Sequence, residues 1–171
     1  FLKAYAHKDL GQKDSAIAAF EEGLRRDPGA ALPAVALRTL KGTPDFFSFF
    51  HSIPTDSILK AGFSADQHDS AHYDIILHDE RTFVVEGGSS ITQTDRIYRA
   101  LDPVGARRLS QWQVPENGTL ISMQVTDYKF YGDSTAAVRT QNAYTLDNVA
   151  VGDLVRVRTH MLLRDSTQIP Q

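Results

Sequence analysis

The spacing of apolar side chains differs between the two parts of the chain, and it predicts helices in the first part and strands in the second. Between residues 15 and 27 small and apolar side chains recur every three or four positions, which is the spacing of one helix face. The residues of this stripe are Ala16, Phe20, Gly23 and Leu24. We interpret Ser15 as the N-cap of this helix, because its hydroxyl can accept a hydrogen bond from a free backbone N–H.

Two further helices are predicted on either side of this one. A shorter stripe precedes it and ends at a glycine; its residues are Leu2, Tyr5, Ala6 and Leu10. A third helix is expected from Pro33 to Lys41, with Gly42 as its C-terminal stop. On the exposed side of the middle helix the pairs Glu21–Arg25 and Glu22–Arg26 have the i,i+4 spacing of favourable helix ion pairs.

From Tyr73 onward the apolar positions alternate, which predicts strands. In the last predicted strand Val155 and Val157 alternate with Arg156 and Arg158, so we expect one dry and one solvent-exposed face. Turn signals recur at 15-residue intervals and separate runs at 91–101, 120–131 and 136–146; the signals are Gly87-Gly88, Asp102-Pro103-Val104-Gly105, Asn117-Gly118, Gly132-Asp133 and Asp147-Asn148.

The predicted fold class is therefore α+β. A helical hairpin plus a third helix spans residues 1–42, and an antiparallel β-sandwich or half-barrel of about six long strands spans 73–165. Residues 43–72 are expected to connect the two parts, and 166–171 form a tail. The connector carries Phe46, Phe47, Phe49 and Phe50, which we interpret as an apolar plug between the parts, with an exposed partner-binding patch as the alternative.

Composition narrows the function classes. The 171 residues include no cysteine, which excludes disulfides, thiolate zinc sites and a cysteine nucleophile within this sequence. The net charge of −3 gives no electrostatic reason to bind nucleic acid or anionic lipid. No apolar run approaches the roughly 20 residues that span a bilayer.

The helical part resembles a tetratricopeptide repeat. The resemblance rests on Ala4-Tyr5, Leu10-Gly11, the ladder Ala16 to Phe20, Gly23-Leu24 and the exit Asp27-Pro28. It implies that further repeats precede Phe1, and that a protein or peptide binds the groove lined by the first helices. The matching partner-binding positions in this sequence are Tyr5 and Lys8.

The β part resembles the all-β domain of unknown function that precedes transglutaminase-like domains in many bacterial proteins. Three segments carry this resemblance: 73–88, Tyr98 to Gly105 and 149–158. It implies a periplasmic or cell-envelope protein with a transglutaminase-like cysteine enzyme downstream. The absent cysteine means that the nucleophile of such an enzyme lies outside this sequence.

Two clusters of polar residues resemble reactive sites but have plainer interpretations. His68, Asp69 and His72 have the i,i+4 imidazole spacing of a metal site, but they lie in an expected polar loop, so no metal is predicted. The adjacent carboxylates Asp79 and Glu80 are interpreted as turn residues.

Nucleotide, serine-nucleophile and nucleic-acid sites are not predicted either. Gly87-Gly88 lacks the lysine of a phosphate loop, and Ser89, Ser90 and Asp95 do not form a nucleophile elbow. Arg107 and Arg108 near Trp112 on one expected strand are interpreted as an exposed edge with an anchored core tryptophan.

The sequence therefore predicts a non-catalytic protein-interaction or substrate-positioning module without a cofactor. Two alternatives remain: an enzyme of unrecognised type that uses histidine and aspartate residues around 66–80, and a structural adhesin-like β-sandwich with a helical spacer. The sequence does not indicate an oligomeric state.

Overall fold

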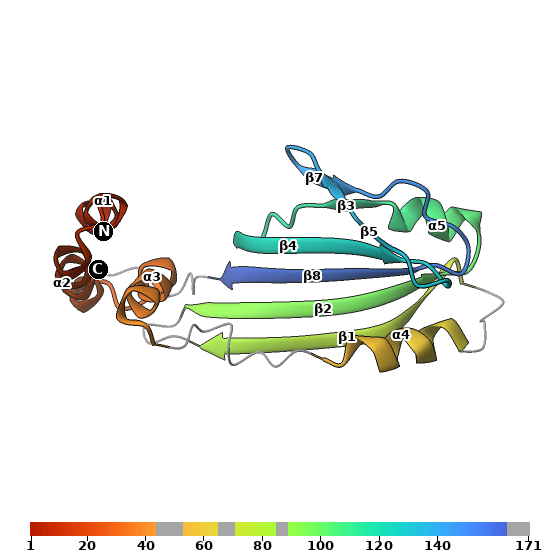
Figure 1. Ribbon diagram of the computed structural model, residues 1–171, viewed down its shortest axis with the longest axis horizontal. Helices are drawn as coiled ribbons and strands as arrows, with labels where there is room; N and C mark the ends of the chain where they lie inside the picture. Colours follow the sequence, from red (N-terminus) through yellow and green to blue (C-terminus); the bar gives the residue numbers. More distant parts are fainter. Residues whose placement is uncertain (44–52, 65–70, 85–88, 164–171) are drawn as a thin grey trace. The chain divides into compact units, whose positions relative to one another are not determined.

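A computed structural model gives the structure of the protein (Figure 1) and describes residues 1–43, 53–64, 71–84 and 89–163. The chain divides into two compact units. The first comprises Phe1–His51, Thr82–Ile91 and Leu162–Gln171, and the second comprises Ser52–Arg81 and Thr92–Met161. The described residues contain both helices and antiparallel sheets, so the predicted α+β class is confirmed.

Three helices in the first unit follow the predicted order: α1 (Leu2–Asp9), α2 (Lys13–Arg26) and α3 (Ala31–Lys41). Ala4, Ala16 and Phe20 are buried between them, and α3 ends at Gly42 in the left-handed conformation, as predicted. The predicted stripe of α1 is wrong at its ends, because Leu2 and Leu10 are 90% and 71% exposed.

Two local predictions for α2 also need correction. The helix begins at Lys13 with Gln12 as its N-cap, so Ser15 lies inside the first turn and is not the cap. Glu22 forms the predicted ion pair with Arg26 and also pairs with Arg25. Glu21 instead pairs with Lys41 at 2.7 Å, since α3 brings that lysine close.

The second unit is built on a five-stranded sheet in the order β1-β2-β8-β4-β5 (Figure 1). Its strands are β1 (Tyr73–Val84), β2 (Ser90–Ala100), β8 (Leu154–Leu163), β4 (Thr119–Tyr128) and β5 (Ser134–Ala136). A smaller sheet has the order β3-β7-β6, with β3 (Gln111–Gln113), β7 (Ala143–Thr145) and β6 (Val138–Arg139).

The strand count differs from the prediction. Four described strands (β1, β2, β4 and β8) have ten or more residues, not about six. The run 136–146 does not form one long strand but breaks into β6 and β7, with β5 ending at Ala136. Asp79 and Glu80 lie in the middle of β1 and not at a turn.

One face of the large sheet carries the apolar core. Tyr98 and Ala100 of β2, Met123 and Val125 of β4, and Val155 and Val157 of β8 belong to one buried cluster. The same buried cluster includes Tyr144 of β7, Leu146 just after that strand, and Leu109 of helix α5 (Pro103–Leu109). The alternation of side chains along a strand therefore sends the intervening residues of β2, β4 and β8 to the opposite face.

Helix α4 (Thr55–Ser64) lies against that opposite face, inside the stretch predicted to be a connector. Gly62 allows the close approach, because a Cβ there would lie 3.1 Å from side-chain atoms of Ile76 and Leu154. Arg99, 3% exposed, donates to the Gly62 carbonyl oxygen at 3.0 Å and pairs with Asp74 at 2.9 Å. The four phenylalanines of the predicted plug lie outside the described residues.

The segment predicted as the turn Asp102 to Gly105 is in fact the start of α5. Asp102 is its N-cap and accepts a hydrogen bond from Gly105 N at 2.7 Å. Its other carboxylate oxygen lies 2.6 Å from His72 Nδ1, and the His72 carbonyl accepts from Leu101 N at 3.0 Å. A Cβ on Gly105 would collide with that carbonyl, so this corner requires glycine. The hydrogen bonds from Gly105 N and His72 lower the pKa of Asp102.

Candidate functional site

Two arginines on the central strand β8 form the most distinctive polar cluster of the sheet. Arg156 holds Asp95 of β2 with two parallel hydrogen bonds, Nε to Oδ1 at 2.8 Å and Nη2 to Oδ2 at 2.6 Å. Arg158 adds bonds of 3.2 and 2.9 Å from Nε and Nη2 to the same Oδ2. Thr55 of α4 accepts a further bond from Arg156 Nη1 at 2.7 Å. This two-pronged geometry is how a guanidinium recognises a carboxylate.

The prediction of an exposed face on β8 is therefore wrong. Arg156 is 8% exposed and Asp95 is fully buried. Burial would raise the pKa of Asp95, but hydrogen bonds and charge from Arg156 and Arg158 outweigh it, so the pKa lies below its usual range. Its hydrogen bonds to Asp95 raise the pKa of Arg156. All three groups are charged at neutral pH, and together they carry one surplus positive charge.

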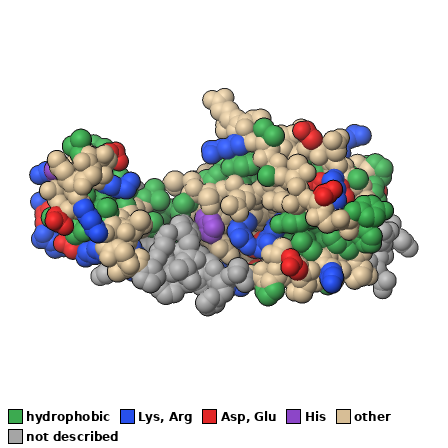
Figure 2. All heavy atoms as spheres, in the orientation of Figure 1, with side chains coloured by type: hydrophobic (Ala, Val, Ile, Leu, Met, Phe, Trp, Pro, Cys, Tyr) green, Lys and Arg blue, Asp and Glu red, His purple; other side chains and the backbone are tan. Residues whose placement is uncertain are grey.

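A small cavity lies on the other side of these arginines, towards β4. It has a volume of about 120 Å³ and is lined by Arg156, Arg158, Gln124, Thr126 and Tyr128. The β4 residues are neutral and offer two hydroxyls and an amide, and the part of the chain that the structure describes places no carboxylate in the lining. Arg158 is the accessible cation, with 27% of its side chain exposed. Figure 2 shows basic side chains gathered beside a histidine over the central strands of the sheet.

The polar row continues two residues further along β8, on the same face. His160 Nε2 lies 2.9 Å from Gln93 Oε1 on β2, and its Nδ1 lies 2.7 Å from Ser122 Oγ on β4. The Gln93 oxygen can only accept, so in the neutral imidazole Nε2 carries the proton and Nδ1 accepts from the serine hydroxyl. In that state the serine hydroxyl donates to one ring nitrogen, and the other ring nitrogen donates to the Gln93 amide oxygen and not to a carboxylate. The row fixes three neighbouring strands to one another.

A second buried charge cluster lies near the end of β4. Lys129 Nζ lies 2.6 Å from Asp127 Oδ2 and 2.5 Å from Asp153 Oδ2, and it donates to the Asn148 carbonyl at 2.7 Å. Asp127 is fully buried, and despite the lysine its oxygens have no well-aligned hydrogen bond among the described residues. Burial and the charge of Asp153 outweigh Lys129 and raise the pKa of Asp127. This cluster ties the end of β4 to the turn before β8.

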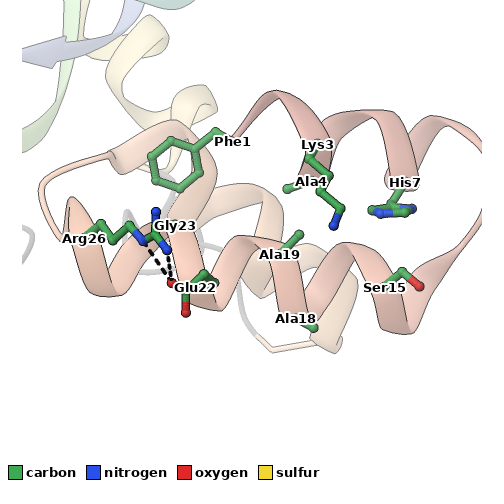
Figure 3. Close-up of a pocket in the computed structure, with 10 residues that line it drawn as sticks. All are labelled: Phe1, Lys3, Ala4, His7, Ser15, Ala18, Ala19, Glu22, Gly23 and Arg26. Atoms are coloured by element: carbon green, nitrogen blue, oxygen red, sulfur yellow. Dashed lines mark hydrogen bonds and ion pairs between the residues drawn. The ribbon is translucent and has the colours of Figure 1, made fainter.

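The helical unit has a separate open groove between α1 and α2 (Figure 3). Its volume is about 690 Å³, and its apolar part consists of Phe1, Ala4, Ala18, Ala19 and Gly23. Phe1 lies over Gly23, which has no Cβ to collide with the ring. Lys3, His7, Ser15, Glu22 and Arg26 complete the lining.

The predicted partner-binding residues lie apart from that groove lining. Tyr5 is half-buried and packs edge-on against Phe20, with ring centroids 5.0 Å apart, and burial raises its pKa. Lys8 is exposed on α1. Tyr5 thus has a structural role in the hairpin, and its role in partner binding remains a prediction.

The other sequence candidates are not brought together. His72 pairs with Asp102 at the start of α5, while His68 and Asp69 lie outside the described residues. Asp79 pairs with Arg81 at 2.8 Å. Within the described ranges no three histidine, aspartate or glutamate side chains lie close enough to hold a metal ion.

The basic and aromatic residues near position 110 also differ from the prediction. Arg107 and Arg108 lie on α5 and Trp112 on β3, so they do not share a strand. Trp112 is anchored as expected, since its Nε1 donates to the Leu109 carbonyl at 2.7 Å and its ring lies 5.1 Å from that of Tyr98.

Sequence reasoning missed the Arg156–Arg158–Asp95 cluster. A signal was present on β8, where Arg156 and Arg158 alternate with apolar residues, since isolated charges in apolar surroundings are costly and require a partner. The partners are 61 and 63 residues apart, so no local pattern connects them.

Comparisons with protein-family models, with curated proteins and with solved structures returned no match for this chain. No helix in the described part of the chain is long and apolar enough to cross a membrane.

Proposed function

We propose that this chain is a non-catalytic module that binds a protein partner and positions a ligand or substrate for chemistry elsewhere. The observation that carries the proposal is the pair Arg156 and Arg158, which faces a cavity of neutral donors. A guanidinium remains protonated under physiological conditions, so it binds and orients an anion but does not exchange protons with it.

The helical unit supplies the protein-binding half of this proposal. On this reading α1, α2 and α3 are the end of a tetratricopeptide-like array. Small residues on the groove floor (Ala4, Ala18, Ala19 and Gly23) allow a further helix to approach closely, as a neighbouring repeat does. Lys8 is exposed on α1, where a partner peptide has access to it.

The sheet unit supplies the positioning half. We propose that its two sheets act as a β-sandwich of the kind that precedes transglutaminase-like domains. The parent would then be a bacterial periplasmic or envelope protein, with the cysteine nucleophile in a later domain. Sequencing the complete gene tests this directly: a secretion signal upstream and a Cys–His–Asp domain downstream are expected.

A turnover assay tests the non-catalytic character. The purified chain is incubated with a peptide-amide substrate and its products are followed by mass spectrometry. We expect no hydrolysis and no amide transfer above a buffer control. Detectable turnover that disappears on replacing His72 or Asp79 by alanine would instead establish the alternative enzyme hypothesis.

A capture experiment tests the role of the helices. A lysate is passed over the complete chain and over a variant with Lys8→Glu, with Lys13→Glu as a control because both lysines are exposed helix residues. We expect a specific partner to be lost with Lys8→Glu and kept with Lys13→Glu. Equal capture by all three proteins would remove Lys8 from the binding surface.

A further inference from the structure

We infer that the cavity between β8 and β4 is a binding site for a carboxylate group, held by Arg158 together with Arg156, Tyr128, Thr126 and Gln124. The inference rests on the proposed function in one respect, namely that the sheet unit positions a ligand. It adds the chemical class of the group that the unit recognises and the residues that recognise it.

The first argument is the local charge. Asp95 balances one of the two guanidinium charges, and among the described residues no carboxylate lines the cavity on the other side. From α4 the arginines meet the neutral hydroxyl of Thr55, and from β4 they meet neutral side chains. Two partly buried guanidinium groups share a single carboxylate, and such a net positive charge is costly away from water, so an anion in the cavity would be stabilised.

The second argument is the inventory of donors. Arg158 uses Nε and Nη2 on Asp95, while its Nη1 has no hydrogen-bond partner among the described residues. Thr126 and Tyr128 contribute hydroxyls and Gln124 contributes an amide. These groups converge on a space of about 120 Å³, which is large enough for one small oxyanion and too small for a large ligand.

The third argument selects carboxylate over phosphate. The surplus of one positive charge is balanced by a monoanion, whereas a phosphate dianion would leave excess negative charge in a partly buried site. Arg156 already donates two parallel hydrogen bonds to the carboxylate of Asp95, and Arg158 donates two more to one of its oxygens. The cavity thus offers a second carboxylate position, on the β4 side of the two arginines.

The test is an NMR titration of the complete chain labelled with ¹⁵N. Sodium acetate is the probe, and sodium chloride and inorganic phosphate are added in parallel at matched ionic strength. We expect acetate to move the Arg158 side-chain Nε–Hε signal saturably, and chloride to give no saturable shift. Saturation by phosphate without acetate, equal saturation by all three anions, or no saturable shift would each overturn the inference.

Variants distinguish a specific binding site at Arg158 from nonspecific attraction of the anion by positive charge. Arg158→Gln is expected to weaken acetate binding about tenfold, because it removes a charge-assisted hydrogen bond. Arg158→Lys keeps the charge and should lie in between, since an ammonium group does not reproduce the planar arrangement of guanidinium donors that serves Asp95 and the cavity together. Arg107→Gln on α5 removes the same charge at an exposed position and should leave the titration unchanged. Equal weakening by Arg158→Gln and Arg107→Gln would refute the assignment.

A second variant protects the test against misfolding. Thr126→Val preserves the shape and the strand preference of the side chain while removing one hydroxyl donor. We expect weaker acetate binding with an unchanged backbone spectrum, and unchanged binding would exclude Thr126 from the site.

The source of the carboxylate is resolved with a matched pair of peptides. Acetyl-trialanine with a free C-terminus is compared with its C-terminal amide. Binding of the free acid alone indicates a polypeptide carboxylate, whereas binding of acetate but of neither peptide indicates a small organic acid. Both results support a carboxylate site, and neither depends on the groove between α1 and α2. Failure of the titration would leave the proposed protein-binding role of the helices standing.

Discussion

The two faces of the large sheet are made by alternating residues of the same strands, yet they hold the structure together in different ways. Val155 and Val157 contact an apolar core, while Arg156 between them forms a buried ion pair with Asp95. Apolar burial is non-directional and tolerates small adjustments. A buried charge pair depends on both partners and on their geometry. One face is thus held by apolar packing, and the other is held by paired charges and carries the proposed carboxylate site.

The largest effect should come from removing the buried carboxylate of the polar face. Asp95→Ala leaves Arg156 and Arg158 without their counter-charge, so we expect a loss of about 4 kcal/mol in the free energy of unfolding. Urea denaturation followed by circular dichroism measures this. Glu21→Ala breaks an exposed pair with Lys41 and should cost about 1 kcal/mol or less. Similar losses for Asp95→Ala and Glu21→Ala would show that the buried charge pair contributes no more to stability than an exposed one.

A somewhat smaller effect is expected on the apolar face. Met123→Ala removes a buried side chain of the core cluster and should cost about 3 kcal/mol. Unlike Asp95→Ala, it leaves no charge uncompensated, so its cost should not change between low and high salt. A strong salt dependence of the Met123→Ala penalty would show that the two faces are not energetically separate.

The pH dependence of stability should differ in sign between two buried aspartates. The folded-state pKa of Asp95 is lowered, so its stabilisation is present above the unfolded value of about 3.9 and is lost as pH falls through the folded pKa. The pKa of Asp127 is raised, so its contribution to stability falls as pH rises from about 3.9 through the folded pKa.

Unfolding of Asp95→Asn and Asp127→Asn across the acid range measures this difference. The deficit of Asp95→Asn relative to the wild type should shrink at low pH. Asp127→Asn should instead improve relative to the wild type as pH rises, with Lys129 still held by Asp153. The same trend in both variants would show that the surroundings of the two carboxylates are not opposed.

The smallest effect on stability is expected at the residue assigned to ligand binding. Arg158→Gln leaves the two-pronged bond between Arg156 and Asp95 intact, so it should cost about 1 kcal/mol or less. Thermal unfolding with and without acetate checks this. A loss as large as that of Asp95→Ala would make Arg158 a structural residue and weaken its assignment to recognition.

The elements with strong local signals were predictable. Helix α3 ends at Gly42 as predicted, and the alternation of β8 correctly groups Val155 with Val157. Alternation shows which residues share a face, but it does not show whether that face is covered. Helix α4 covers part of the polar face of β8, and no pattern within the strand reports a helix about 100 residues earlier.

Asp102-Pro103 illustrates a different limit. Aspartate followed by proline suits both a tight turn and the first turn of a helix, because each needs an acceptor and a fixed φ. Here α5 forms and buries Leu109 and Ala106 against the core, so packing decides between two locally equivalent conformations. The cavity beside Arg158 could not be predicted either, since β2, β8 and β4 meet there from distant parts of the chain.

The corner at Gly105 has a practical use in the search for relatives. The His72 carbonyl occupies the space of any side chain at this position, so every substitution there forces the backbone apart. A distant sequence that aligns a bulky residue with Gly105 must therefore have a different junction after its second strand. An aspartate shortly after that strand, followed three residues later by a glycine, is therefore a simple pattern for recognising homologues whose remaining sequence has diverged.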